Sequence, residues 1–175
     1  MPRISLDRVR GLPDIMTTSD FEFILGSIPG GTSDRNMVVK CQQAEYPGTG
    51  QEAFEVPVHG HVIYIRGRRT FERTVTVAYL EDRTMDTTNQ FESWFEFIAG
   101  TNSGTSGGYK RSYALDGPRL ITYDTTGLAI KEVIFYGLQP QSKPSIQYDG
   151  SSSQAYLVNM SFVYDHYEPS NIAIR

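Results

Sequence analysis

A change of hydrophobic period between residues 67 and 100 constrains the fold of this chain more than any other feature. Residues 74–79 alternate, with the bulky side chains at the odd positions, so one side of a strand is buried. A few residues later the apolar side chains recur at i, i+3, i+4 and i+7, which places them on one stripe of a helix. The stripe consists of Phe91, Trp94, Phe95 and Ile98.

The helix is expected at about 86–99, and its aromatic stripe is expected to pack into a β core. Thr84 or Asp86 is the expected N-terminal cap, and Gly100 is the residue expected to end the helix. The segment therefore predicts a strand, a turn and a helix in that order, which is information about fold and not about function.

The rest of the chain consists mostly of short alternating segments separated by turn signals. Gly117 and Gly127 supply the glycine that a tight reversal requires. This pattern predicts a mainly β fold with two packed antiparallel sheets, a sandwich or barrel, and one inserted helix. The expected strands are 20–28, 36–43, 52–58, 61–65, 73–80, 109–115, 119–124, 129–138, 145–148 and 154–164.

Length and charge limit the organisation and the partners. A chain of 175 residues is near the size of one domain. We expect an N-terminal arm at 1–19, which mixes Arg, Asp, Gly and Pro without a period, a single domain at 20–168 and a C-terminal tail at 169–175. With 16 Lys and Arg against 20 Asp and Glu, the net charge of −4 disfavours a protein that grips nucleic acid by charge.

Cysteine usage and hydropathy indicate where the protein is found. Cys41 is the only cysteine, so neither an internal disulfide nor a cysteine-based zinc site is expected, and this side chain is expected to be a small buried hydrophobe. No apolar run has the length of a signal peptide or of a membrane span. We expect a soluble chain in the cytoplasm without a membrane partner.

Two patterns suggest chemistry, and neither has the context that the chemistry needs. Residues 104–108 match G-x-S-x-G, and Asp149 and His166 follow in the order of a hydrolase triad. A nucleophile elbow requires a strand before the serine and a helix after it, whereas the expected order here is the reverse. His59 and His61 have the spacing of two metal ligands, but no third ligand is evident and Gly60 suggests a turn. We therefore expect no enzyme, no metal site and no cofactor.

Unprotected strand edges and one basic cluster indicate contacts between copies. The expected strands 61–65 and 154–164 contain no proline and almost no charge, so their edges are free to pair with another chain. Head-to-tail pairing that closes produces a ring. The basic cluster is expected to make salt bridges to an acidic neighbour, with a nucleic-acid contact as the alternative. It consists of Arg66, Arg68, Arg69 and Arg73.

A series of residues between about Phe21 and Glu168 forms a recognisable pattern when taken in order. They are Cys41, Pro47-Gly48, Val58, Gly60, Gly67, Arg69-Thr70-Phe71, Thr74 to Val77, Phe91, Trp94, Ala99-Gly100, Tyr109-Lys110, Lys131, Gly137 to Pro140 and Tyr164 to Glu168. This series resembles the tube proteins of contractile bacteriophage tails, the inner cylinder through which DNA leaves the virion. It departs from that family's pattern in the closing aromatic and acidic stretch.

The resemblance implies a structural virion protein that forms stacked hexameric rings. Its implied partners are other copies of itself, the tail sheath, the baseplate and terminator proteins, the tape-measure protein, and DNA in transit without specific binding. The tail of the virion is the implied location, with assembly in the host cytoplasm. Contacts between subunits or rings are expected at Arg3, Arg8, Arg10, Tyr46, Pro47, Gly48 and the four arginines of the basic cluster.

Repetition around a ring multiplies every charge that faces the channel, so a basic wall would hold DNA by its phosphates. We therefore expect the channel-facing side chains to sum to zero or below. Two alternatives remain open. One is a tube protein of a contractile secretion system or bacteriocin-like injection particle, and the other is a monomeric β-sandwich module that binds a carbohydrate through exposed aromatic residues.

Overall fold

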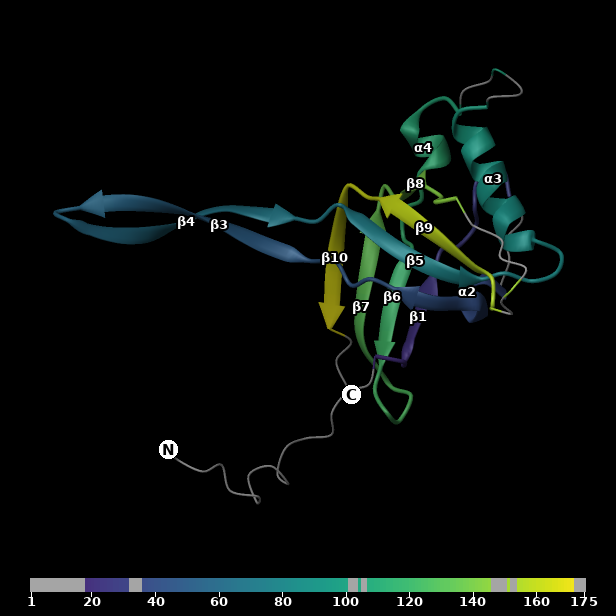
Figure 1. Ribbon diagram of the computed structural model, residues 1–175, viewed down its shortest axis with the longest axis horizontal. Coiled ribbons are helices and arrows are strands. Elements are labelled where there is room, and N and C mark those ends of the chain that lie inside the picture. The colour runs from purple at the N-terminus through teal and green to yellow at the C-terminus, as the bar shows by residue number, and fades with distance from the viewer. Residues whose placement is uncertain are drawn as a thin grey trace.

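Two four-stranded antiparallel sheets form the body of the structure (Figure 1), a computed structural model that describes residues 18–31, 36–100, 104, 107–145, 151 and 154–171. Sheet A has the strand order β1 (Phe21–Ile24), β6 (Arg119–Tyr123), β7 (Ala129–Tyr136) and β10 (His166–Asn171). Sheet B has the order β2 (Cys41–Ala44), β5 (Thr74–Leu80), β9 (Leu157–Val163) and β8 (Gln139–Ser142). The expected fold class is confirmed.

A third sheet has two strands only, β3 (Thr49–Val58) and β4 (His61–Phe71), and it projects away from the body as a long hairpin. The helices are α2 (Asn36–Lys40), α3 (Asp86–Ile98) and α4 (Lys110–Tyr113). None of the described helices is long and apolar enough to cross a membrane.

The core consists of aromatic and aliphatic side chains from both sheets and from α3. Phe162 of sheet B lies at the centre, with its ring 5.9 Å from that of Phe91 and 6.0 Å from that of Trp94. Trp94 is fully buried, and its indole Nε1–H donates to the carbonyl of Tyr113 at 2.8 Å. A buried indole needs such a partner, so α4 is tied to the helix that fills the core.

The inserted helix is confirmed, but its cap differs from the expected one. Neither Thr84 nor Asp86 caps it, and Met85 stands at the N-cap position in a left-handed conformation. The carboxylate of Glu81 accepts instead from the backbone N–H groups of Thr87 and Thr88, at 3.2 and 2.8 Å. At the other end, the N–H of Ala99 bonds to the carbonyl of Phe95.

Burial opposes ionisation of Glu81, but the hydrogen bonds from Thr88 and the neighbouring backbone outweigh it and lower the pKa of this carboxyl. The cap therefore depends on an ionised carboxylate supplied by the end of β5.

One of the expected strands is wrong in its first half, and another is wrong over most of its length. Residues 36–43 were expected to be one strand, but the chain forms α2 first and only then β2, because Met37 turns into the core while Val39 is 81% exposed. Residues 109–115 contain α4, where the Ser112 N–H bonds back to the Tyr109 carbonyl at 2.8 Å. The expected strand 145–148 lies almost entirely outside the described residues.

The expectation about strand edges is half right. The segment 154–164 contains β9, which lies between β5 and β8 and therefore has no free edge. The segment 61–65 belongs to β4, which pairs only with β3 and keeps its other edge open. β10 reaches Asn171, so sheet A extends past residue 168, the expected end of the domain.

Candidate functional site

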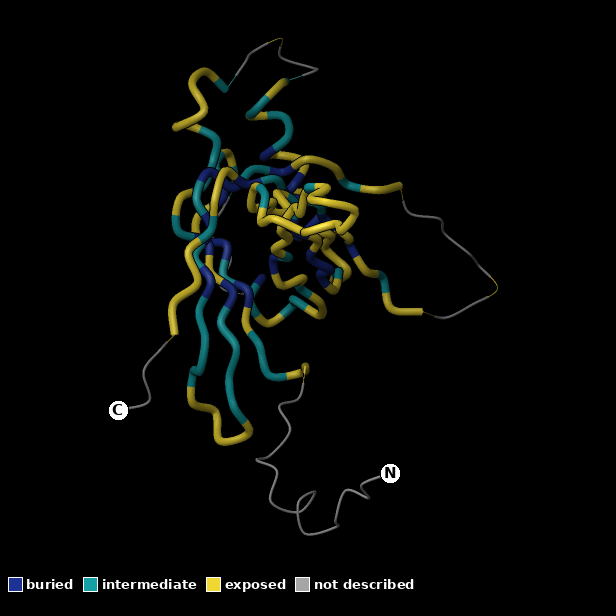
Figure 2. The backbone as a smooth tube through the Cα atoms, turned by 90° about the vertical axis from the view of Figure 1, so that its left-hand side faces the viewer, coloured by how far each residue is buried: buried dark blue, intermediate teal, exposed yellow. Residues whose placement is uncertain are grey.

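The hairpin β3–β4 is the most unusual surface of the molecule. Every residue in its strands is exposed except Val56 and Gly67, whereas β5 of sheet B is mostly buried. Figure 2 looks along the hairpin and shows it as exposed, in contrast to the buried strands behind it. An isolated two-stranded hairpin is marginally stable in water at best, so strands of 10 and 11 residues require further contacts.

The register of the hairpin separates its side chains into two faces. Residues directly opposite each other share a face, and the pairs alternate between faces along the strands. Phe54 pairs with Ile65, Val56 with Ile63, and Val58 with His61. We call this set the apolar face, because it holds five apolar side chains and one histidine.

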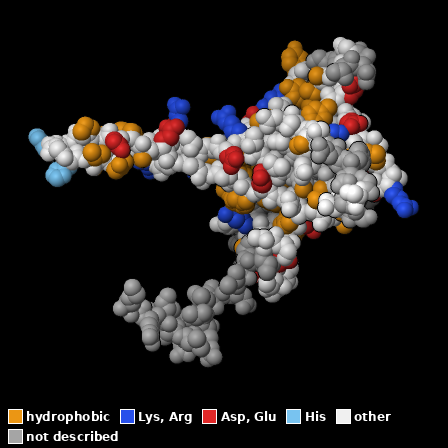
Figure 3. All heavy atoms as spheres, viewed as in Figure 1, with side chains coloured by type: hydrophobic (Ala, Val, Ile, Leu, Met, Phe, Trp, Pro, Cys, Tyr) orange, Lys and Arg blue, Asp and Glu red, His pale blue; other side chains and the backbone are white. Residues whose placement is uncertain are grey.

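The other face carries the pairs Ala53–Arg66, Glu55–Tyr64 and Pro57–Val62, so it mixes charged with apolar groups. On the apolar face, Phe54 is 51%, Ile63 50% and Ile65 44% exposed. The hydrophobic side chains of the hairpin are visible in Figure 3, toward the histidines at its tip. A contiguous row of large apolar side chains in water is typical of a surface that another protein covers.

The base of the hairpin is fixed to the body by several contacts. Phe71, the last residue of β4, packs edge-on against Tyr167 of β10 with 6.1 Å between ring centroids. The hydroxyl of Tyr164 donates to the carbonyl of Glu72, and burial, with the nearby Tyr167 and Glu72, raises the pKa of Tyr164 to about 12. The Glu72 N–H bonds to the carbonyl of Gly48 at 3.3 Å. The hairpin therefore projects in a defined direction.

The basic cluster lies mostly on this hairpin, near its base. Its four arginines, three in β4 and Arg73 just before β5, are exposed, and none forms an ion pair with another described residue. The guanidinium of Arg69 lies 4.9 Å from the ring centroid of Phe71, a cation–π contact. A register shift between Gln51 and Ala53 opens a recess lined by Arg66 and Arg69.

The expected contact loop divides into buried and exposed parts. Pro47 is buried, and a Cβ added to Gly48 would stand 2.9 Å from the Glu72 carboxylate, so both residues belong to the hairpin base. Tyr46 is exposed, with the ammonium of Lys131 4.8 Å from its ring centroid. Arg3, Arg8 and Arg10 lie outside the described residues.

The residues of the helix stripe contribute to the core. Phe91 and Trp94 are fully buried, and Phe95 and Ile98 are partly buried against the core. All four support the fold that carries the hairpin, and the fully buried Phe91 and Trp94 are not available to a partner.

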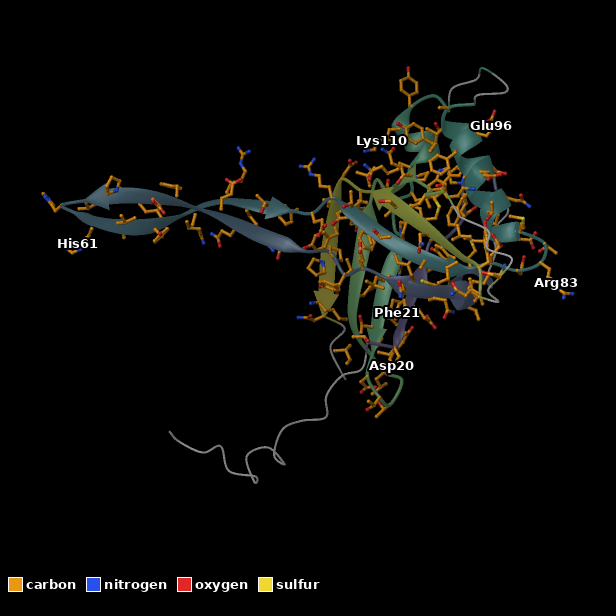
Figure 4. All side chains as sticks on the ribbon, in the orientation of Figure 1. Asp20, Phe21, His61, Arg83, Glu96 and Lys110 are labelled. Atoms are coloured by element: carbon orange, nitrogen blue, oxygen red, sulfur yellow. The ribbon has the colours of Figure 1, made fainter. Side chains whose placement is uncertain are left out.

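The two patterns that suggested chemistry are not assembled by the described residues. Ser106 and Asp149 lie outside them, and His166 is exposed on β10, stacked on Tyr136 with 4.6 Å between centroids. His59 and Gly60 form the tip of the hairpin, with φ of 46° and 84°, beside His61 (Figure 4). No group of three or more metal-binding side chains occurs among the described residues.

Sequence reasoning missed the apolar face. Residues 52–58 and 61–65 were expected to be strands, and the turn between them contains Gly60, so the sequence was sufficient to predict a hairpin here. The cross-strand register, which places Phe54, Ile63 and Ile65 on one face, was not predicted from the sequence. The signal was the alternation of apolar residues at 54, 56 and 58, followed after the turn by the apolar run at 62–65.

A comparison with protein-family models identifies one family for most of the chain. The family model described as phage tail tube protein matches residues 16–170. No curated protein matches the chain in sequence.

Solved structures share the fold at low identity. A chain from the baseplate of the anti-feeding prophage, 6-fold symmetrised, superposes with a TM-score of 0.63 at 10% identity, covering 93% of this chain and 100% of that one. A chain from the tube-terminating cap of the same particle gives 0.62 at 12% identity, covering 92% and 94%. A chain from the sheath-tube complex of an extracellular contractile injection system, PVC, gives 0.61 at 10% identity, covering 97% and 100%.

Proposed function

Because the chain belongs to the phage tail tube protein family, we propose that it forms six-fold rings that stack into the inner tube of a contractile phage tail. In this proposal the tube is the conduit for DNA, and its partners are other copies of the chain, the sheath, the baseplate and terminator proteins, and the tape-measure protein. The role is structural and involves no catalysis. Assembly takes place in the host cytoplasm, and the tail is the final location.

The observation that carries the proposal is the apolar face of the β3–β4 hairpin. Phe54, Ile63 and Ile65 are each about half exposed, on a projection that has no described contact with the body beyond its base. In a self-assembling tube every copy of the chain has other copies beside it, so a second copy is the partner expected on this face. Docking of this face on a neighbouring copy buries the apolar side chains and stabilises a hairpin that is marginal alone.

Free strand edges support lateral closure of the rings. Sheet A ends in β1 and β10, and sheet B ends in β2 and β8, so each sheet offers two edges to neighbouring copies. Heterologous pairing of unlike edges closes into a ring when the rotation between copies allows it. The six-fold baseplate that contains a similar fold is consistent with six copies per ring.

The nearest alternative is the same kind of tube in a contractile injection particle. It is favoured by the similar folds found in the anti-feeding prophage and in the PVC system. In that case the cargo is not phage DNA, whereas the hairpin and the ring contacts keep their roles. A monomeric carbohydrate-binding module is the alternative from another class.

Light scattering coupled to size-exclusion chromatography, with negative-stain electron microscopy of the same fractions, tests the proposal. We expect rings or hollow tubes that grow more abundant as the protein is concentrated. A chain that stays monomeric at high concentration, and also in the presence of assembled baseplates, would overturn it and favour the binding module.

A further inference from the structure

A β-bulge in the hairpin brings two arginines of the basic cluster onto the same face. Gln51 pairs with Arg69 and Ala53 pairs with Arg66, so two residues of β4 stand opposite a single residue of β3. In a regular strand, residues three apart point to opposite faces. Here the extra residue returns Arg69 to the face that Arg66 occupies, so both guanidinium groups lie on one side of the hairpin.

The bulge also opens the recess between these two arginines. Arg66, Gly67 and Arg69 line it from β4, and residues 49–51 line it from β3. A Cβ added to Gly67 would stand 3.0 Å from the carbonyl oxygen of Glu52, so the two strands approach closely because this residue is glycine. Arg68, although it is the next residue of β4, does not line the recess. The bulge therefore divides the basic cluster into two arginines at the recess and two outside it.

No described carboxylate neutralises the pair at the recess. Neither Arg66 nor Arg69 forms an ion pair with another described residue. Glu52 alternates with the cross-strand partners of the two arginines and projects from the opposite face, and Glu55 lies one cross-strand pair nearer the tip. The guanidinium of Arg69 is held 4.9 Å from the ring centroid of Phe71, which is itself packed on the body. The recess thus presents two uncompensated positive charges, one of them fixed in position.

The charge of the hairpin is opposite to that of the rest of the chain. β3 and β4 contain three arginines, two glutamates and no other Lys or Asp, a net charge of +1. Of the 16 Lys and Arg and 20 Asp and Glu in the whole chain, the remaining residues therefore carry 13 and 18, a net charge of −5. Figure 3 shows the Lys and Arg side chains of the hairpin on its part nearer the body. A second copy thus offers an excess of carboxylates to a docking hairpin.

We propose that the recess between Arg66 and Arg69 binds one carboxylate side chain of a neighbouring copy. The proposal rests on the tube function proposed above and adds the chemical group that the base of the hairpin recognises. Arginine is the side chain best suited to this task, because its planar guanidinium donates two parallel hydrogen bonds to a carboxylate. Two guanidinium groups that face one recess supply donors to both oxygens of the carboxylate, and the contact with Phe71 reduces the entropy that Arg69 loses on binding.

Zero-length cross-linking in assembled tubes tests the proposal. A carbodiimide joins an amine to a carboxylate only where the two groups touch. The Arg69→Lys variant places an amine in the recess, and Arg68→Lys is the matched control because it places the same amine on the adjacent residue, outside the recess. Each variant is assembled from a mixture of ¹⁵N-labelled and unlabelled chains. A cross-link between copies then yields peptide pairs of mixed isotope composition in mass spectrometry.

We expect the Arg69→Lys variant to form a cross-link between copies from position 69 to one Asp or Glu, and the Arg68→Lys variant to form none from position 68. Tubes that contain no such cross-link, or only cross-links within one copy, would overturn the proposal, and a recess that binds free phosphate would give this result. Equal cross-linking from both variants would overturn it as well. Absence of tubes by electron microscopy would instead count against the tube function itself, so the two failures are distinguishable.

A carboxylate supplied by the same chain provides a second test. Gln51 is the cross-strand partner of Arg69 and lines the recess, so Gln51→Glu should pair with that arginine and exclude the carboxylate of the neighbour. Arg68→Gln lowers the net charge by the same amount outside the recess. We expect the critical concentration for assembly to rise about tenfold for Gln51→Glu, as for the loss of a charged hydrogen bond, and less than about threefold for Arg68→Gln. An equal rise for both variants, or none for Gln51→Glu, would overturn the proposal.

Discussion

Substitution of Ile63 by serine should raise the protein concentration needed for tube assembly without unfolding the chain. Ile63 lies in the middle of the apolar face, opposite Val56, and is 50% exposed. Full burial of an isoleucine side chain is worth about 1.5–3 kcal/mol, so covering the exposed half contributes about 1 kcal/mol to docking. A serine hydroxyl buried there without a partner costs about 1 kcal/mol or more. The sum of about 2 kcal/mol weakens each contact roughly 30-fold.

Val62→Ser is the matched control, because Val62 is the next residue of β4, is 55% exposed and lies on the opposite face. The assay is the critical concentration for assembly, measured by pelleting and light scattering, with circular dichroism as the check on folding. Surface substitutions of this kind usually change stability by about 0.5 kcal/mol or less. An unchanged critical concentration for Ile63→Ser, or an equal increase for Val62→Ser, would refute docking through the apolar face.

Three further predictions concern the basic cluster, the helix cap and the core. Arg69→Glu should impair assembly while Arg69→Lys preserves it. Equal tube yields for the two variants in sedimentation would show that Arg69 is not part of the contacts between copies. The lowered pKa of Glu81 means that its stabilising effect is complete above the ordinary glutamate value of 4.5 and is lost as the pH falls below it. Glu81→Gln should therefore be less stable at pH 7 and show a shallower loss of melting temperature on acidification, and an unchanged acid profile would contradict this assignment of the cap. Trp94→Ala should lower the free energy of unfolding, measured in urea, by about 3–5 kcal/mol, because it leaves a cavity and deprives the Tyr113 carbonyl of its hydrogen bond. A loss below about 1 kcal/mol would contradict the place of Trp94 in the core.

The sequence predicts the parts of this fold that depend on local pattern. The helix was predictable because Phe91 and Trp94 share a stripe at helical spacing, and the tight turns because Gly117 and Gly127 adopt positive φ. The helix cap was not, because Glu81 acts from the end of the preceding strand, outside the usual N-cap position.

Tertiary contacts determine the structure of the segments that the local sequence pattern did not predict correctly. The β-branched residues of 36–40 favour a strand, yet burial of Met37 against the core selects α2. The apolar run at 62–65 predicts a strand, but it does not show which face of the strand is covered or whether the strand's partner is the same chain or another one. The exposed hairpin therefore emerges only from the pairing of β3 with β4 alone.

Cryo-electron microscopy of the assembled chain, with its rotational symmetry determined without an imposed value, tests the central claim most directly. The account predicts hollow, six-fold rings in which the β3–β4 hairpin of each copy contacts another copy through Phe54, Ile63 and Ile65. An assembly without a channel, or one in which these three side chains remain in solvent, would contradict it.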